Sequence, residues 1–361
     1  MIIETVDLED LRMSNLNEEF QINEITPEQK KSMKSRIITA LIMALVGIPA
    51  LIFGGWVFFI LVMALLILAC SEAIHVVNKP VPVLVMVFMY IIAMYFAYWI
   101  FAKNITGQYI AARESGTALN IDFDVPFLTN LFSEGFNEIY VSSTGIITIL
   151  VILFMSSFLS NKFSILDVGY FLMMSVLLGL GFQSIYYLRY SPTFAFKELV
   201  DTSDPLFRYM QSSFLLLYVV IGTIFNDIGA YFVGVLFGKH KVNPRISPKK
   251  TWEGLIGGVI ISALLSTGFA ILVSLLGRPM HPYLTHNEWY WILLISLLIP
   301  FLSIVGDFSF SAIKRHNGKK DFSKIFKEHG GVLDRLDSII FSGIGASVLV
   351  VLISHGWQVF K

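Results

Sequence analysis

Long apolar runs constrain the fold of this chain more than any other feature of its sequence. Of the 361 residues, 55% are hydrophobic and only 14% are charged. In soluble domains about a quarter of all residues are charged. A helix needs roughly 20 apolar residues to cross a bilayer. The sequence therefore predicts an all-α, polytopic transmembrane helical bundle of about nine spans, at residues 37–53, 55–71, 82–102, 142–160, 165–187, 212–236, 254–276, 290–312 and 338–356.

The first two predicted spans form one continuous apolar run, which we divide at Gly54-Gly55. A single helix over 37–71 would exceed the thickness of the bilayer, and a pair of glycines interrupts a helix at little cost. We therefore expect two spans there.

The distribution of basic residues predicts the orientation of the bundle. With the N-terminus in the cytoplasm, 19 of the 26 Lys and Arg fall in cytoplasmic segments, as the positive-inside rule requires. Residues 1–36 are then a polar cytoplasmic arm, and they do not resemble a cleavable signal peptide. The two densest polar segments, 237–253 and 313–337, lie on the cytoplasmic side as well.

Three regions follow from this layout. The arm 1–36 precedes the transmembrane helices of 37–211, which include an external segment, 103–141, whose aromatic residues we expect at the headgroups. Residues 212–361 form a second transmembrane region that contains both polar segments. A net charge of zero gives no electrostatic footprint for nucleic acid, and the single Cys70 forms no intrachain disulfide.

The motif that leads into the first polar segment begins at Asp227, inside the apolar run of the predicted span 212–236. A carboxylate within a membrane is costly and usually faces a cavity, a partner or an ion. Alternatively, Asp227 caps a helix that breaks at Asn226-Asp227. The neighbouring small residues are explained by close helix packing; they are Gly229, Ala230, Gly234 and Gly238.

Farther along the same segment, lysines and hydroxyls gather near a predicted helix start, where phosphate oxygens bind readily. The candidate substrate-binding residues are Ser247, Lys249, Lys250, Thr251 and Glu253. A positive-inside anchor would explain the two lysines equally well.

The second polar segment is the richest in residues suited to polyphosphate chemistry. Gly330-Gly331 permits a tight turn before the last helix, so Asp334 and Asp337 would project together from its first turn. Together with Asp307 at the end of the eighth span, they are predicted to bind Mg²⁺, which prefers oxygen ligands. Complementarity to the helix dipole is the alternative explanation for the two acids.

Other polar residues of this segment complete the candidate site, with Lys and Arg as partners for phosphate. His329 has no Cys or second His nearby with which to build a zinc site, so we interpret it as a hydrogen-bonding or acid/base residue. The remaining candidates are Ser311, Lys314, Arg315, Lys320, Asp321 and Arg335.

The order and spacing of these residues from Ser311 to Asp337 resemble the signature of the phosphatidate cytidylyltransferases. The segment Ser247-Pro-Lys-Lys-Thr-Trp-Glu-Gly254 and the upstream Asp227-x-x-Ala230-Tyr231 look like other segments of that family. Lys327 departs from the pattern, where the family usually has Pro or Gly. Asn226-Asp227 and the long 103–141 segment are more similar to eukaryotic-type members than to compact bacterial ones.

The resemblance implies a reaction in which the phosphate of phosphatidic acid attacks the α-phosphorus of CTP, forming CDP-diacylglycerol and pyrophosphate. Asp307, Asp334 and Asp337 would then bind Mg²⁺, with Asp227 as a further carboxylate and room for a second cation. The resemblance implies that Lys249, Lys250, Lys314, Arg315 and Arg335 neutralise phosphates, and that Asp321 and His329 orient the triphosphate or hold the loop.

The family also implies a multi-pass protein whose active site faces the cytoplasm, in the inner membrane of a bacterium or in an organelle membrane of a eukaryote. Its partners would be CTP, phosphatidic acid and the lipid bilayer, with a homodimer as one candidate assembly. Two alternatives stay open, a CTP-dependent polyprenol kinase and a cation-coupled transporter whose Asp227 and Asp307 line an ion path.

Overall fold

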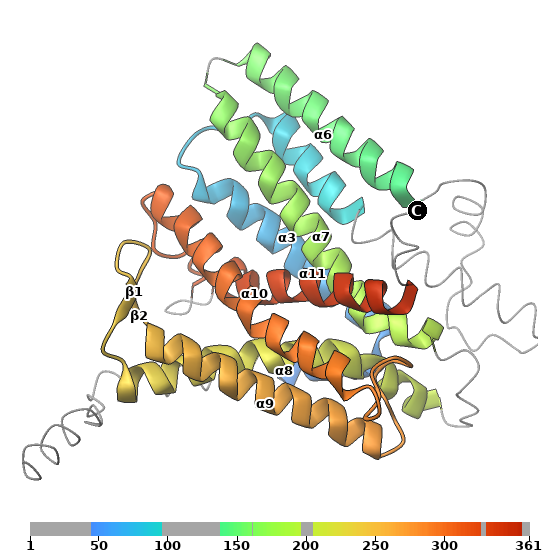
Figure 1. Ribbon diagram of the computed structural model, residues 1–361. Coiled ribbons are helices and arrows are strands. Elements are labelled where there is room, and N and C mark those ends of the chain that lie inside the picture. The colour runs from blue at the N-terminus through green and yellow to red at the C-terminus, as the bar shows by residue number, and fades with distance from the viewer. Residues whose placement is uncertain (1–44, 96–137, 161, 196–204, 326–329, 356–361) are drawn as a thin grey trace, which may run out of the picture.

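Long helices make up most of the part of the chain that the structure, a computed structural model, describes (Figure 1). The described residues are 45–95, 138–160, 162–195, 205–325 and 330–355. The long helices are α3 (Gly55–Val76), α6 (Glu138–Leu159), α7 (Ile165–Ala195), α8 (Pro205–Phe237), α9 (Trp252–Leu275), α10 (Trp289–His316) and α11 (Leu333–His355).

Six of the helices within the described ranges are long and apolar enough to cross a membrane, namely α3 and α7 to α11. They correspond to six of the predicted spans. The predicted spans 37–53, 82–102 and 142–160 lie only partly within the described residues or give shorter apolar helices, such as Val83–Tyr95. The external segment 103–141 lies outside the described residues except for its last four positions.

The chain bends at the predicted glycine pair. A helix over 45–53 ends before Gly54, which has a φ of 61°, and α3 starts at Gly55 with a φ of 48°. Such positive φ angles suit glycine because it lacks a Cβ atom. The predicted helix boundary is therefore confirmed. In contrast, α8 runs without interruption through Asn226 and Asp227, so the alternative of a broken helix at these residues is wrong.

The segment before α9 forms a small β-hairpin, which the expectation of an all-α fold did not include. Strand β1 (Lys241–Asn243) pairs antiparallel with β2 (Ser247–Thr251). The Asn243 side chain accepts hydrogen bonds from the backbone N–H groups of Arg245 and Ile246 at 3.2 and 3.3 Å, and this local bonding stabilises the turn. The membrane-spanning part of the described chain remains helical.

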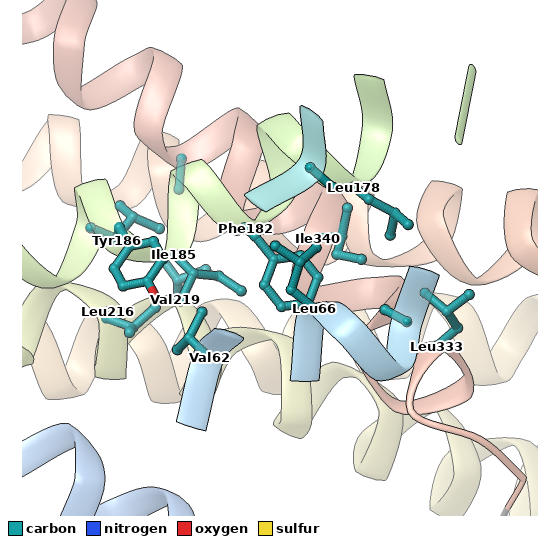
Figure 2. Packing of buried hydrophobic residues seen from close by; sticks show 14 of the residues in the cluster. Val62, Leu66, Leu178, Phe182, Ile185, Tyr186, Leu216, Val219, Leu333 and Ile340 are labelled. Carbon is teal, nitrogen blue, oxygen red and sulfur yellow. The ribbon is translucent and has the colours of Figure 1, made fainter. Parts of the chain in front are cut away.

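Buried apolar side chains join the two halves of the sequence. Figure 2 shows Val62 and Leu66 of α3 packed among Phe182 of α7, Val219 of α8 and Ile340 of α11. Lipid tails are as apolar as these side chains, so close packing rather than exclusion from water holds the helices together. The core therefore fixes α3 against α11, although they are far apart in the sequence.

Helices α8 and α9 approach each other closely through small residues. A Cβ atom added at Gly258 would lie 2.7 Å from the carbonyl oxygen of Asn226, and one added at Gly254 would lie 2.7 Å from that of Ala230. Bulkier residues would separate the two backbones. This confirms helix packing as the explanation for the small residues around Ala230.

The hairpin lies where α8 and α10 end and α9 begins (Figure 1). The end of α3 and the starts of α7 and α11 reach the same end, as shown by the ion pair between Lys79 and Asp167 at 3.2 Å and the hydrogen bond from Asn78 to the Asn317 carbonyl at 3.4 Å. We call this the hairpin end of the bundle. It gathers the two predicted polar segments in one place.

Candidate active site

Lys250 of β2 and Asp307 of α10 form an ion pair at the hairpin end. The Asp307 carboxylate also accepts a hydrogen bond from the hydroxyl of Ser311, one turn later, at 3.3 Å. The Lys250 ammonium lies 4.6 Å from the centre of the Phe308 ring, which favours the cation electrostatically. A charged contact thus joins the first polar segment to the part of α10 that leads into the second.

Lys314 of α10 and Asp334 of α11 form a second, more buried ion pair at 2.6 Å. The other carboxylate oxygen of Asp334 accepts hydrogen bonds from the backbone N–H groups of Phe322 and Gly331 at 2.9 and 2.8 Å. Gly330 has a φ of 78°, a left-handed conformation that glycine adopts readily. Asp334 therefore organises the loop between α10 and α11.

Three carboxylates from three helices gather beside these ion pairs. Asp337 of α11 is buried and interacts electrostatically with Asp307 and Asp227. Asp227 of α8 interacts in turn with Asp307. We call Asp227, Asp307 and Asp337 the carboxylate cluster.

This cluster contains three of the four predicted carboxylates, Asp227, Asp307 and Asp337, but not Asp334. Helices α10 and α11 cross closely at Gly306, where an added Cβ atom would lie 2.6 Å from the Asp337 carbonyl oxygen. This crossing brings Asp307 to Asp337, while Asp334 turns toward Lys314. Asp227 joins them because the Asn226 amide donates a hydrogen bond to Ser303 of α10 at 3.0 Å.

The described residues contain no group of three or more Asp, Glu, His or Cys side chains close enough together to hold a metal ion. Asp307 is engaged by Lys250 instead. In the described arrangement Lys250, Lys314 and Arg335 interact electrostatically with members of the cluster and offset part of the repulsion among its carboxylates.

Two of the predicted substrate-binding residues have structural partners at the junction of hairpin and helix. The Thr251 hydroxyl accepts a hydrogen bond from the Gly254 N–H at 3.2 Å and so caps α9. Glu253 accepts hydrogen bonds from the backbone N–H groups of Lys239 and His240 at 3.1 and 3.2 Å and contacts the His240 ring at 2.6 Å. These contacts fix the hairpin that presents Lys250.

The remaining predicted residues differ in their contacts and exposure. Arg315 donates hydrogen bonds to the carbonyl oxygens of Ile246 and Lys319 at 3.4 and 3.3 Å and so joins the hairpin to the end of α10. Lys249, Lys320 and Asp321 are exposed, whereas Ser247 and Arg335 are half-buried. His329 and Lys327 lie outside the described residues.

A site of this kind, with basic side chains around clustered carboxylates at one end of a helical membrane bundle, is suited to binding a polyphosphate. A model of the cytidylyltransferase family matches residues 34–353 of the chain. The chain belongs to the cytidylyltransferase family.

Two staphylococcal relatives cover most of the length of this cytidylyltransferase, and a third covers half of it. The phosphatidate cytidylyltransferase of Staphylococcus epidermidis is 28% identical over 312 residues, which is 86% of this chain and 95% of the relative. That of Staphylococcus aureus is 28% identical over 313 residues, with the same coverage of both chains. That of Staphylococcus haemolyticus is 35% identical over 181 residues, 50% of this chain and 58% of the relative. These relatives are bacterial, so they lend no support to the predicted similarity with eukaryotic-type members.

The cytidylyltransferase also has a buried acid at the hairpin end that the sequence analysis did not select. Glu72, near the end of α3, is 3% exposed, and its carboxylate accepts hydrogen bonds from the start of α11. Glu72 lies at the end of an apolar run, and this position could have identified it. A carboxylate there, like Asp227, is costly in a membrane and usually faces a cavity, a partner or an ion.

An apolar groove of about 460 Å³ lies beside the ion pair of Lys250 and Asp307. It runs between α9 and α10, from the hairpin at Val242 along the first turns of α9. Its wall includes Phe308, whose ring contacts the Lys250 ammonium. The other lining residues are Trp252, Leu255, Ile256, Val259, Ile260, Phe301 and Ile304.

Proposed function

We propose that this cytidylyltransferase transfers CMP from CTP to phosphatidic acid, producing CDP-diacylglycerol and pyrophosphate. The observation that carries the proposal is the convergence of Asp227, Asp307 and Asp337 with Lys250 and Lys314 at the hairpin end, beside an apolar groove. Family membership and the activity named for the staphylococcal relatives support the same reaction.

The reaction needs alignment and charge neutralisation rather than covalent help from the protein. A phosphate oxygen of phosphatidic acid attacks the α-phosphorus of CTP, and the bond from that phosphorus to the oxygen shared with the β-phosphorus breaks. Pyrophosphate leaves with the bonding electron pair. The attacking phosphate is already an anion, so no side chain has to remove a proton from it.

Lys250, Lys314 and Arg335 are the side chains placed to neutralise the phosphates. Lys250 and Lys314 are held by Asp307 and Asp334, and Arg335 interacts electrostatically with Asp227. The ion pairs of Lys250 and Lys314 keep these two cations oriented before the substrate arrives, which is the preorganisation that electrostatic catalysis requires.

The carboxylate cluster would hold Mg²⁺ if its three side chains drew closer together than in the described arrangement, in which no such group is close enough for a metal ion. Its donors would be the carboxylate oxygens of Asp227, Asp307 and Asp337, since a small divalent cation prefers oxygen ligands and usually binds few carboxylates together with substrate phosphates. The mutual repulsion of the three carboxylates supports the assignment, because a cation would relieve it. Bound there, the ion would neutralise charge on the triphosphate. In this proposal Asp334 binds Lys314 rather than the metal.

The apolar groove supports a lipid as the acceptor. We assign it to one acyl chain of phosphatidic acid, since an acyl chain entering between α9 and α10 would bring its phosphate to Lys250 at the mouth of the groove. The distribution of Lys and Arg along the sequence supports an N-terminus and an active site in the cytoplasm, in a bundle of about nine spans. CTP would then reach the site from solution.

Release of pyrophosphate from CTP by the purified protein in detergent tests this proposal. We expect release to require both phosphatidic acid and Mg²⁺, and CDP-diacylglycerol to form in equal amount. Chelation of divalent cations should abolish it, and added Mg²⁺ should restore it. Release of CDP in place of pyrophosphate would identify a polyprenol kinase instead, and ion flux in liposomes without nucleotide would identify a transporter.

A further inference from the structure

Glu72 connects the N-terminal half of the chain to the start of α11. One oxygen of its carboxylate accepts hydrogen bonds from the Val332 N–H at 2.8 Å and the Ser323 hydroxyl at 2.6 Å, and the other accepts from the Leu333 N–H at 2.7 Å. The side chain is almost completely buried. A buried carboxylate with three hydrogen-bond donors is well stabilised in its charged form.

These contacts supply α11 with a cap that its own sequence lacks. The first N–H groups of a helix have no partner within the helix, and the residues just before α11, Gly330, Gly331 and Val332, carry no polar side chain. The carboxylate of Glu72 satisfies two of these N–H groups and complements the positive end of the helix dipole. An added Cβ atom at Gly331 would collide with this carboxylate, so a glycine is needed there for the contact.

The same segment carries the active site. Asp334 directly follows Leu333 and pairs with Lys314. Asp337 lies about one turn farther along α11 and belongs to the carboxylate cluster. Glu72 and Asp334 hold neighbouring parts of the loop, because Glu72 binds Ser323 and Val332 while Asp334 binds Phe322 and Gly331.

The end of α3 contacts the loop at two further points. The Lys319 ammonium donates a hydrogen bond to the His75 carbonyl oxygen at 2.5 Å, and the Asn78 amide donates one to the Asn317 carbonyl oxygen at 3.4 Å. The apolar core holds the other part of α3 against α7, α8 and α11 (Figure 2). Helix α3 is therefore a rigid support from which Glu72 reaches the loop.

We propose that Glu72 is a positioning residue for the reaction, which sets the start of α11 so that Lys314, Asp334 and Asp337 meet the substrates in a fixed geometry. The expected effect on kcat rests on the proposed function. Outer partners that orient the residues of a site commonly contribute about 10-fold to 100-fold to activity. Glu72 touches no substrate in this scheme and acts only through the loop.

Asp167 provides a matched control for the general effect of losing a buried acid. It is also buried and at the hairpin end, and it belongs to the start of α7. Its carboxylate accepts hydrogen bonds from the Ser164 N–H at 2.8 Å and the Ser164 hydroxyl at 2.7 Å, and it pairs with Lys79. None of these partners belongs to the loop between α10 and α11.

The experiment compares full-length wild-type protein with the variants Glu72→Gln, Glu72→Ala and Asp167→Asn in the same detergent. Glutamine keeps one acceptor but presents an N–H group where the second oxygen stood, so Glu72→Gln tests the hydrogen bonds with little change in shape. We expect Glu72→Gln to lower kcat per folded molecule by at least about tenfold, with an unchanged KM for phosphatidic acid. Asp167→Asn should lower the melting temperature and leave kcat per folded molecule unchanged.

Hydrogen exchange of the peptide that contains Val332 and Leu333 gives a readout that does not depend on activity. We expect faster exchange there in both Glu72 variants and wild-type exchange in Asp167→Asn. Equal losses of kcat in Glu72→Gln and Asp167→Asn, or unchanged exchange at α11 in the Glu72 variants, would overturn the positioning role. An inactive wild-type protein would count against the proposed function alone, and the exchange data would still decide whether Glu72 holds α11.

Discussion

Lys314 and Asp334 face each other across the loop that joins α10 to α11, with 2.6 Å between the ammonium nitrogen and the carboxylate oxygen. Both side chains are largely buried, and the second oxygen of Asp334 is occupied by two backbone N–H groups. Asp334 is thereby engaged by Lys314, whereas Asp227, Asp307 and Asp337 interact electrostatically with one another.

Replacing Asp334 with asparagine should destabilise the protein as well as inactivate it. The change leaves the ammonium of Lys314 buried without its counter-ion, and breaking a buried pair in this way costs about 3 kcal/mol or more. We expect a lower melting temperature in detergent together with loss of pyrophosphate release. A variant that melts like the wild type would show that the pair contributes little to the fold.

Lys250 and Lys249 are adjacent in sequence but differ in environment. Lys250 pairs with Asp307 and contacts Phe308, whereas Lys249 is exposed. We expect Lys250→Gln to lower kcat/KM by about 100-fold, as for other preorganised electrostatic contacts, and Lys249→Gln to cause a much smaller loss. Steady-state kinetics with both substrates measures the difference. Equal losses would mean that the ion pair does not distinguish the two lysines.

Asp337→Asn should inactivate the enzyme through the carboxylate cluster. The variant removes one charge from the set that we assign to Mg²⁺, so activity should fall by at least about 100-fold and respond weakly to added Mg²⁺. Glu288→Gln, which alters an acid beside the first turn of α10 away from the site, is the control. Wild-type Mg²⁺ dependence in Asp337→Asn would remove Asp337 from the metal site.

Filling the apolar groove should discriminate between lipid substrates. Ile256 lines the groove, while Leu264 lies two turns farther along α9 and outside it. We expect Ile256→Trp to raise KM for long-chain phosphatidic acid more than for a short-chain form, because only the long chain needs the full groove. Leu264→Trp should affect neither. Equal effects of Ile256→Trp on both lipids would indicate that the groove holds no substrate chain.

Two glycines of α9 provide a test of the close contact with α8. An added methyl group at Gly258 would strike Asn226 and Ala230, whereas one at Gly268 would meet no atom within 4 Å. Gly268→Ala should be neutral or stabilising by up to about 1 kcal/mol because alanine favours helices. Gly258→Ala should be destabilising by about 1–3 kcal/mol through overpacking and should reduce activity by displacing Asp227. Comparison of melting temperature and turnover in the two variants measures both effects, and equal stability would contradict the close approach.

The local features of the site could be predicted from neighbouring residues alone. Gly330 has a positive φ just before α11, and Asp334 lies in the first turn of that helix as expected. The helix break at Gly54 was predicted for the same reason, since a positive φ is a property of the residue itself. The expectation that Asp334 and Asp337 project together is wrong, because Asp334 pairs with Lys314 whereas Asp337 interacts with Asp307 and Asp227. The hairpin was missed because its strands are short and depend on a local turn at Asn243.

The sequence by itself determined that this chain is a helical membrane protein and which residue types its polar segments bring to a phosphate, because hydropathy and spacing are local properties. Only the tertiary structure decided which acids face one another. The crossing of α10 and α11 at Gly306 places Asp307 with Asp337, and the packing of α3 brings Glu72 to the start of α11. Such contacts depend on how helices pack against each other, and apolar periodicity within a single helix does not specify that packing.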